Sequence, residues 1–231
     1  MTSLIHIFYL NDFKKRLRLL NHYCNAYYIK CIEDEVRIIG TNNNCTVELI
    51  IRNVKMKPNT KTKMFNIDKT LSLLKSGNRK DSLIIDMTNH NITKLTIYKL
   101  NKSTEINYNS GSNDSEEFTL SNDYDTTVIL ASIKFEKNEA ILAFCRNFSK
   151  KNMKITVSSN QIILNASCQE YSGSFVQNID KSELYGYSSQ IFTLPADIFM
   201  KLSADFQCTN LKFGDNFVIA EGDFGRIIYY I

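Results

Sequence analysis

The sequence predicts an α+β protein built from two topologically similar domains. Most segments alternate apolar and polar residues, four short segments have helical spacing instead, and the order of these segments repeats along the chain. Matching apolar positions lie 126 residues apart: Ile7 and Ile133, Ile29 and Ile155, Val36 and Ile162, and Ile38 and Leu164. A matched order of helices, turns and strands is hard to obtain by chance, so we interpret the chain as two copies of one domain.

Antiparallel strands are predicted wherever the alternation occurs. The alternating segments are 27–40, 46–54, 82–87 and 93–100 in the first half, and 153–166, 173–179, 210–215 and 225–231 in the second. Turn residues at Glu33–Asp34 and Ser159–Asn160 divide the longest segments into hairpins. Further along, MFNID at 64–68 matches IFTLP at 191–195 at an offset of 127.

Helices are predicted for the four segments whose apolar residues recur at helical spacing. Asn11 or Asp12 is expected to cap the first helix, and Pro195 to stand near the first turn of the last. The apolar sides are Leu10, Phe13, Leu17 and Leu20; Ile67, Leu71 and Leu74; Ala140, Ile141, Phe144, Cys145 and Phe148; and Ile198, Phe199 and Leu202.

Composition argues against several classes of protein. The six Cys form no CxxC pair and the three His are scattered, so no metal site or other cofactor is expected, and the Cys are expected to be reduced in an intracellular protein. No segment has the length of a signal peptide core or a membrane span. The motifs GxxxxGK, HExxH and GxSxG are absent, so the chain is not expected to be an enzyme.

The polar faces of the predicted helices are basic, although the net charge is only +4. Grouped by helix, the cations are Lys14, Lys15 and Arg18; Lys69 and Lys75; Arg146 and Lys150; and Lys201. For a single helix, an ordinary solvated face is the alternative explanation. We expect these residues at equivalent positions of the repeat, where they would merge into one surface. Such a surface suits sequence-independent binding to duplex DNA, which carries one negative charge per about 1.7 Å.

Four strings carry a resemblance to a known family. FKKRL in the first helix, LLKSGN at 73–78, FCRNFS at 144–149 and AEGDFGRIIYYI at 220–231 are similar to strings of the sliding clamps of the proliferating cell nuclear antigen type. The resemblance covers nearly the whole chain. It implies a DNA-clamp fold, with antiparallel sheets outside and four helices lining the interior of a ring of three subunits. Such a ring encircles duplex DNA and tethers DNA polymerase and other replication proteins through short peptides.

The resemblance also implies roles for individual residues. Lys14, Lys15, Lys75 and Arg146 match basic DNA-facing positions and Lys150 lies near another, whereas Arg18, Lys69 and Lys201 are added by the helical projection alone. The chain would divide into domains 1–105 and 126–231, joined by an acidic connector at 106–125. Partner peptides would meet Phe118 and Leu120 in the connector, Thr41 and Cys45 on an outer strand, and Tyr230 in the closing hairpin. Subunits would join edge to edge through strands near 104–109 and 172–178, with Ile106 and Phe175 at the interface.

Some features leave alternatives open. Thr41 and Cys45 stand where the family has larger residues, and the chain stops soon after Tyr230, which weakens the expectation of partner binding. Many clamps are acidic, whereas this chain is at +4, so a viral processivity factor that holds DNA without forming a ring is one alternative. A clamp-like scaffold associated with checkpoint or transcription functions is another. The expected location is the nucleus or the site of viral genome replication.

Overall fold

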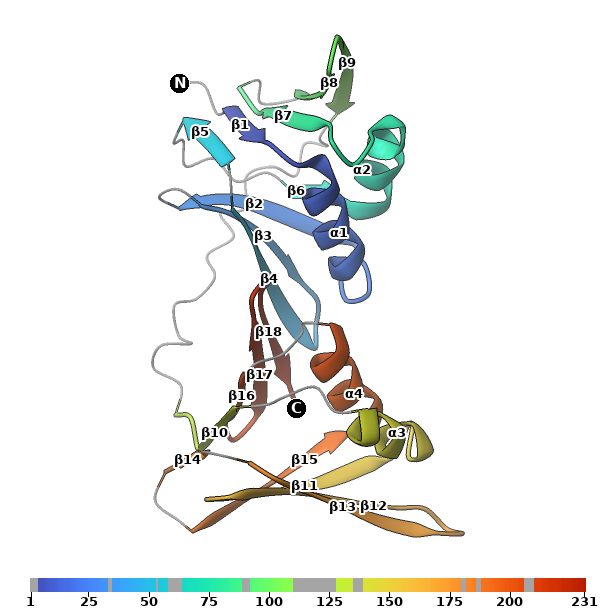
Figure 1. The fold of residues 1–231 in the computed structure, drawn as a ribbon, viewed down its shortest axis with the longest axis vertical. Coiled ribbons are helices and arrows are strands. Elements are labelled where there is room, and N and C mark those ends of the chain that lie inside the picture. Colours follow the sequence, from blue (N-terminus) through green and yellow to red (C-terminus); the bar gives the residue numbers. More distant parts are fainter. Residues whose placement is uncertain are drawn as a thin grey trace. The chain divides into compact units, whose positions relative to one another are not determined.

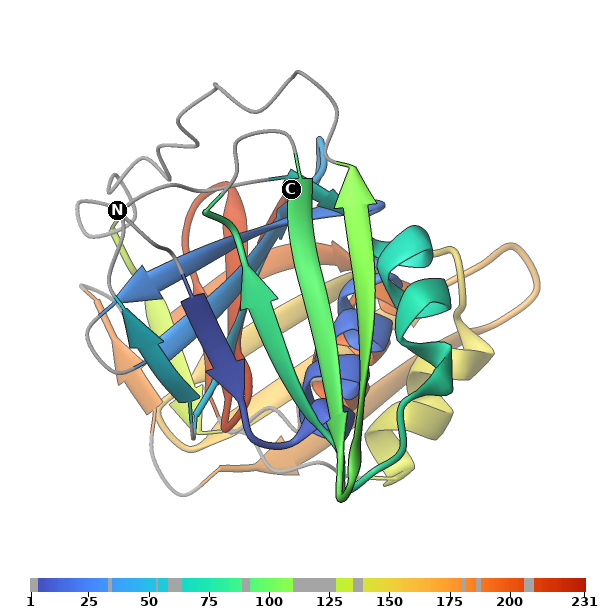
Figure 2. The same ribbon diagram turned by 90° about the horizontal axis from the view of Figure 1, so that it is seen from above.

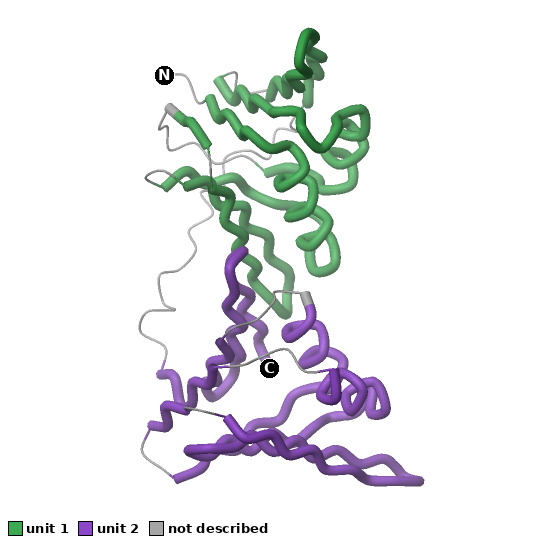
Figure 3. Tube along the Cα trace, in the orientation of Figure 1, with its two compact units in different colours: residues 1–120 green, residues 121–231 purple. Residues whose placement is uncertain are grey.

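The chain divides into two compact units, Met1–Leu120 and Ser121–Ile231 (Figure 3). The computed structural model describes residues 4–32, 35–52, 54–57, 64–88, 92–109, 128–134, 139–179, 182–185, 188–205 and 210–231. In these residues, each unit contains two α-helices and its own antiparallel strands (Figure 1). Residues 110–127 lie outside the described part, so the connector at 106–125 stays a prediction, although strand β9 runs through Asn109.

In the first unit, two groups of strands pair in antiparallel register. The first group has the order β5-β1-β7-β8-β9 and comprises β5 (Val54–Lys57), β1 (Leu4–Ile7), β7 (Ser82–Asp86), β8 (Ile92–Lys99) and β9 (Lys102–Asn109). Figure 2 shows β1, β7, β8 and β9 side by side. The second group has the order β6-β2-β3-β4 and comprises β6 (Met64–Asn66), β2 (Ala26–Ile32), β3 (Glu35–Thr41) and β4 (Cys45–Ile51).

The helices of the first unit pack through the apolar faces that the sequence predicts. Helix α1 (Leu10–Leu20) buries Leu10, Phe13, Leu17 and Leu20 completely, which confirms the predicted face. Helix α2 (Ile67–Leu73) continues into a 3-10 turn, η1 (Leu74–Ser76). Helix α1 packs against both α2 and β4, so the helices form one layer over the strands.

The predicted cap of α1 is wrong. The helix begins at Leu10, so Asn11 and Asp12 lie inside the first turn. Tyr9 occupies the cap position, and its side chain accepts no backbone hydrogen bond there. A bond from another part of the chain takes the place of the cap, since the Leu10 N–H donates to the Asp81 carbonyl at 2.9 Å. In contrast, the Asn66 side chain caps α2 by accepting from the Lys69 N–H at 2.8 Å.

The second unit repeats this arrangement. One group of strands has the order β14-β10-β16-β17-β18: β14 (Ser182–Leu184), β10 (Ala131–Lys134), β16 (Asn210–Phe213), β17 (Phe217–Gly222) and β18 (Gly225–Tyr230). The other has the order β15-β11-β12-β13: β15 (Ser189–Pro195), β11 (Asn152–Ser158), β12 (Gln161–Ser167) and β13 (Ser172–Asn178). Helices α3 (Glu139–Asn147) and α4 (Ala196–Asp205) pack against each other. The two units therefore have the same strand order and the same helix positions.

The register of the strands tests the predicted repeat residue by residue. Ile29 pairs with Ile38 in the first unit, and Ile155 pairs with Leu164 in the second, which confirms the offset of 126. The offset of 127 for the following segment is wrong. Tyr27 pairs with Phe65, whereas Met153 pairs with Leu194, so Phe65 corresponds to Leu194 at an offset of 129. A shift of two residues keeps the same side chains on the core face, so alternation alone cannot detect it.

The predicted apolar faces of the helices contain small errors. Ala140, in the first turn of α3, is exposed, and Leu142 is buried. In α2, Ile67 is buried as predicted, but the second buried position is Thr70 and Leu71 is half-buried. The Thr70 hydroxyl can be buried because it donates to the Asn66 carbonyl at 2.7 Å and lies 3.4 Å from the Tyr27 hydroxyl. Phe144 and Ile198 are also half-buried rather than buried.

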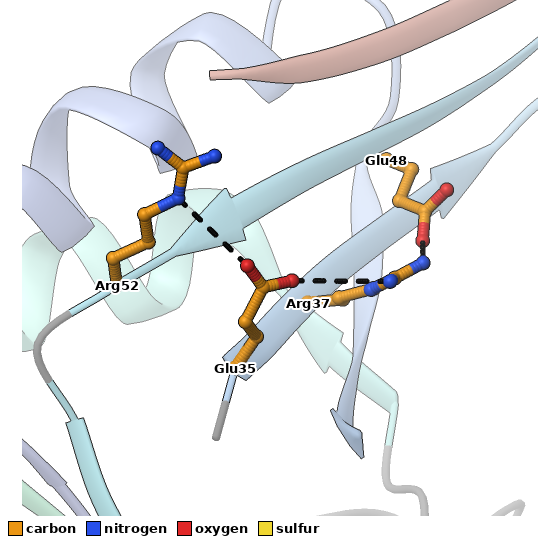
Figure 4. A network of polar contacts seen from close by, with 4 residues as sticks. All are labelled: Glu35, Arg37, Glu48 and Arg52. Atoms are coloured by element: carbon orange, nitrogen blue, oxygen red, sulfur yellow. Dashed lines mark hydrogen bonds and ion pairs between the residues drawn. The ribbon is translucent and has the colours of Figure 1, made fainter. Parts of the chain in front are cut away.

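Opposite the helix-facing side, β3 and β4 carry a network of charged side chains (Figure 4). The Arg37 guanidinium lies 2.7 Å from the Glu48 carboxylate and 3.8 Å from that of Glu35, which in turn lies 3.8 Å from Arg52. The side chain of Glu48 is only 7% exposed, and a carboxylate this buried needs a cation close by. Arg37 supplies that cation and ties β3 to β4.

Candidate nucleic-acid interface

Helices α1 and α2 of the first unit lie antiparallel, as their connecting hydrogen bonds show. Near the start of α1, the Lys14 ammonium donates to the Leu74 carbonyl at 3.2 Å and to the Gly77 carbonyl at 3.0 Å. Just beyond the end of α1, the Asn21 amide donates to the Asp68 carboxylate at 3.1 Å, in the first turn of α2. The basic residues of the two helices therefore belong to one layer.

Most of the predicted cations of the first unit are exposed. Lys15, Arg18, Lys69 and Lys75 are exposed, and Lys14 is half-buried because its ammonium is bonded to backbone carbonyls. The Lys69 ammonium lies 4.6 Å from the centre of the Tyr108 ring, a cation–π contact that orders its side chain. Four of the five predicted cations can thus reach a ligand without losing a carbonyl bond.

Arg16 belongs to the same basic string but has a different role. Its Nε donates to the Ile50 carbonyl on β4 at 2.6 Å, and its Nη1 donates to the Asp12 carbonyl at 3.3 Å. Burial lowers the pKa of Arg16, an effect that nearby Asp12 opposes and Arg52 adds to. Arg16 therefore anchors α1 on β4 and does not extend the exposed cationic face.

The cations of the second unit are fewer, and one is placed differently from the prediction. Arg146, Lys150 and Lys201 are all exposed. However, α3 ends at Asn147, so Lys150 stands in the following turn, with a left-handed φ of 66°, and does not form an i,i+4 helical pair with Arg146. A non-glycine residue in this conformation marks a tight reversal of the chain, which redirects the Lys150 side chain.

The cations do not occupy equivalent positions of the two units, contrary to the prediction. When the buried residues of α1 and α3 are matched, Arg18 corresponds to Arg146, but Lys14 and Lys15 correspond to Leu142 and Ala143. With the offset of 129, Lys69 is equivalent to Ile198 in the repeat, and Lys201 is equivalent to Ser72. Only Arg18 and Arg146 repeat among these predicted cations. The matched core positions preserve the fold, whereas exposed positions are free to differ.

The two predicted interface residues lie on strands at the ends of the pairing order. Ile106 is half-buried on β9, and Phe175 is half-buried on β13. Phe175 belongs to an aromatic cluster, with its ring centre 6.0 Å from that of Phe144, which lies 5.0 Å from Phe148. Among the described residues of each unit, β9 pairs only with β8, and β13 pairs only with β12. Each strand therefore offers an open edge for a further strand.

The predicted peptide-binding residues have diverse environments. Phe118 and Leu120 lie outside the described residues, Thr41 is half-buried at the end of β3, and Tyr230 is 36% exposed on β18. Cys45 is only 2% exposed. A hydrogen bond with Cys24 lowers the pKa of Cys45 while burial raises it. The buried Cys45 thiol thus packs inside the first unit and does not present a surface contact.

An apolar cluster on the second unit escaped the sequence prediction. Phe217, Ile219 and Ile228 form a buried cluster against which Ile129 packs. Phe217 pairs with Tyr230, so the exposed tyrosine borders this cluster. The segment is held in place by the Leu130 N–H, which donates to the Phe213 carbonyl at 2.8 Å, while neighbouring Val128 is 59% exposed. The sequence signal is the apolar run VIL at 128–130, directly after the acidic segment.

The described residues contain neither a candidate metal site nor a candidate membrane span. No group of three or more His, Cys, Asp or Glu side chains there could hold a metal ion. None of the helices there is long and apolar enough to span a membrane.

The chain is similar to known proteins in structure, whereas no match is found in sequence. No protein-family model matches the chain, and no curated protein matches it in sequence. The crystal structure of Proliferating Cellular Nuclear Antigen from Entamoeba histolytica matches with a TM-score of 0.72 at 14% identity, over 99% of this chain and 97% of that chain. A structure of the PCNA2–PCNA3 complex from Sulfolobus tokodaii matches with a TM-score of 0.71 at 13% identity, over 99% of this chain and 98% of that chain. The chain therefore has the two-unit α+β fold of the proliferating cell nuclear antigen type of sliding clamp, as the sequence predicts.

Proposed function

We propose that this chain is a DNA sliding clamp, a non-enzymatic processivity factor that encircles duplex DNA without sequence specificity. The observation that carries the proposal is the match of its fold, over 99% of the chain, to structures of proliferating cell nuclear antigens. The exposed cations of α1, α2, α3 and α4 support it. A clamp needs loose and uniform attraction to phosphates, and long Lys and Arg side chains without base-reading partners provide this.

In this proposal, three copies form a ring with the four helices of each copy facing the DNA. The open edge of β9 in one copy would pair with the open edge of β13 in the next, adding main-chain hydrogen bonds across each interface. Ile106 and the aromatic cluster around Phe175 would supply the apolar part of that interface. The ring would then hold DNA by topology, and the cations would keep the duplex centred and mobile.

Partner proteins would dock through short peptides on the outer side of the clamp. Val128 and Tyr230 are the exposed residues beside the buried cluster of Phe217, Ile219 and Ile228, and they offer an apolar surface where a peptide anchor could dock. Thr41, Phe118 and Leu120 are further candidates on the basis of the resemblance. DNA polymerase and other replication proteins are the proposed partners, in the nucleus or at the site of viral genome replication.

The DNA contact is tested by substituting Lys15, Arg18 and Arg146 together with Ala. Each lost phosphate contact should lower the slope of log K against log salt by about 0.9. The slope for the triple variant should therefore fall by about three times that amount, on any duplex sequence. The control is the triple alanine variant of Lys30, Lys55 and Lys154, which removes the same charge from exposed strand positions. Equal slopes for the two variants would show that only net charge matters and would contradict the proposal.

Assembly and polymerase tethering are tested separately. Light scattering coupled to size exclusion should give the mass of a trimer, and Ile106→Asp or Phe175→Asp should give monomers. Primer extension by the replicative polymerase should be more processive with the parent protein than with the Lys15, Arg18 and Arg146 variant. A trimer that binds DNA but leaves extension unchanged would favour the clamp-like scaffold instead. A stable monomer that stimulates extension would favour a processivity factor without a ring.

A further inference from the structure

Two exposed cations lie outside the helices, in the turn between η1 and β7. Arg79 and Lys80 are the central residues of a four-residue turn from Asn78 to Asp81. The Asp81 carboxylate accepts from the Asn78 N–H at 2.7 Å, and the Asn78 carbonyl accepts from the Asp81 N–H at 3.2 Å. Asp81 is 7% exposed, and its carboxylate stabilises the turn through this hydrogen bond. The turn is therefore ordered from within, with both cations on its outside.

The same turn is fastened to α1 at both ends. At its start, the Gly77 carbonyl accepts from the Lys14 ammonium at 3.0 Å. At its end, the Asp81 carbonyl accepts from the Leu10 N–H at 2.9 Å. Gly77 also lies against the helix so closely that an added Cβ would stand 2.1 Å from the Leu10 Cδ2 atom. The position of Arg79 and Lys80 is thus fixed relative to the helical layer.

Charge is concentrated at this end of the layer. Residues 75–80 contain Lys75, Arg79 and Lys80 and no acid, and all three side chains are exposed. The nearest carboxylate in sequence, that of Asp81, already accepts the Asn78 N–H within the turn. Like charges gathered without acids repel one another, and an anion at this site would relieve the repulsion. At the offset of 129, the corresponding residues of the second unit are ADFQCT at 204–209, which contain one acid and no cation.

We propose that Lys75, Arg79 and Lys80 form a phosphate-binding cluster for the backbone of duplex DNA, and that Lys14 positions this cluster. The inference rests on the proposed clamp function and names a contact beyond the helical faces. The Arg79 guanidinium can hold two phosphate oxygens at once, and the lysines act as point charges. Lys14 acts by tying Leu74 and Gly77 to α1, since its ammonium is already bonded to their carbonyls.

The cluster is tested with the Arg79→Ala, Lys80→Ala double variant in duplex binding across a salt series. The slope of log K against log salt should fall by about 1.8, from two phosphate contacts, with the thermal unfolding midpoint unchanged. The matched control is Lys30→Ala with Lys55→Ala, two exposed cations on strands of the same unit. The charge-conserving variant Arg79→Lys, Lys80→Arg should keep most of the slope.

The outcomes separate this inference from the proposed function. If the double variant keeps the parent slope while the Lys15, Arg18 and Arg146 variant loses slope, the cluster is wrong and the clamp proposal stands. If neither variant changes the slope, DNA binding by this layer is wrong altogether.

The role of Lys14 is tested by the Lys14→Met change made alone and together with a Lys75→Ala, Arg79→Ala, Lys80→Ala triple variant. A positioning residue acts through the cluster, so the change should weaken binding in the parent and have no further effect once all three cations are alanine. Additive losses in the two backgrounds would show that Lys14 contacts phosphate directly and would overturn its positioning role.

Discussion

The two units pair their strands in the same order, yet their helical layers carry very different charge. In the first unit, residues 10–20 and 67–80 contain eight cations and two acids. In the second unit, residues 139–151 and 196–205 contain four cations and three acids. Phe13 and Leu17 of α1 match the buried Ile141 and Cys145 of α3, and only Arg18 and Arg146 match among the predicted cations. The comparison shows that a repeated fold constrains the core and leaves the exposed face free to specialise.

The units also differ in how their second helices begin. Asn66 accepts the Lys69 N–H at the start of α2, and the offset of 129 places Pro195 at the corresponding position before α4. One unit thus uses a side-chain hydrogen bond, whereas the other uses a residue whose fixed φ suits entry into a helix. Both helices receive the same backbone bond, from Ile67 N–H to the Asn25 carbonyl and from Ala196 N–H to the Lys151 carbonyl, each near 3 Å.

The largest expected effect comes from the matched core positions Phe65 and Leu194. Phe65→Ala should lower the free energy of unfolding by about 3–5 kcal/mol, because the ring stacks on Tyr27 with centres 5.2 Å apart and meets Tyr108 edge to face at 5.4 Å. Leu194→Ala should cost about 2–5 kcal/mol, since Leu194 is fully buried. Denaturant unfolding measures both changes. A loss below about 1 kcal/mol at either position would show that the two sites are not equivalent core positions.

A smaller loss is expected from Gly77→Ala. The new Cβ would approach the Leu10 Cδ2 atom to 2.1 Å, so the buried Leu10 side chain or the backbone around it must shift, at a cost of about 1–3 kcal/mol. Gly173→Ala in the second unit is the matched change, with its Cβ 2.9 Å from the Phe148 ring, whose neighbour Phe144 is only half-buried. Thermal unfolding should therefore rank Gly77→Ala as the more harmful. The reverse order would show that the first unit is the more adaptable.

The smallest effect is expected at the helix starts. Asn66→Ala removes the hydrogen bond to the Lys69 N–H and should cost about 1 kcal/mol. Pro195→Ala, at the corresponding position, removes no side-chain hydrogen bond and should cost less. Unfolding midpoints of the two variants give the comparison directly. Equal losses would mean that the Asn66 cap adds nothing beyond the shared backbone bond.

Much of the fold could be predicted from the sequence because it depends on short-range spacing. The apolar face of α1 and the offset of 126 between β2–β3 and β11–β12 both follow from periodicity. The offset of 129 could not be found in this way, since it differs by two residues from the predicted 127, and a two-residue shift leaves alternation unchanged. The start of α1 at Leu10 depends on the Asp81 carbonyl, which lies far away in the sequence. Long-range hydrogen bonds of this kind leave no local pattern.

The candidate site shows the same limit. A helical projection identifies Lys15 and Arg18 as exposed, but it also counts Lys14, whose ammonium is bonded to carbonyls 60 and 63 residues away. It extends the α3 pattern to Lys150, although the helix has already ended and the chain reverses there. It omits Arg79 and Lys80 because they lie in a turn. Projection finds the direction of a side chain and cannot find its bonding partner.

Tyr108 joins two parts of the first unit that would otherwise respond separately. It lies on β9, its hydroxyl accepts the Asn66 N–H at 2.9 Å at the start of α2, and its ring lies under the Lys69 ammonium. A displacement of the outermost strand must therefore be transmitted through this phenol to the beginning of α2. A further strand that pairs with β9 would restrain Tyr108. Pairing at this edge and the position of the Lys69 ammonium would then depend on each other through one aromatic side chain.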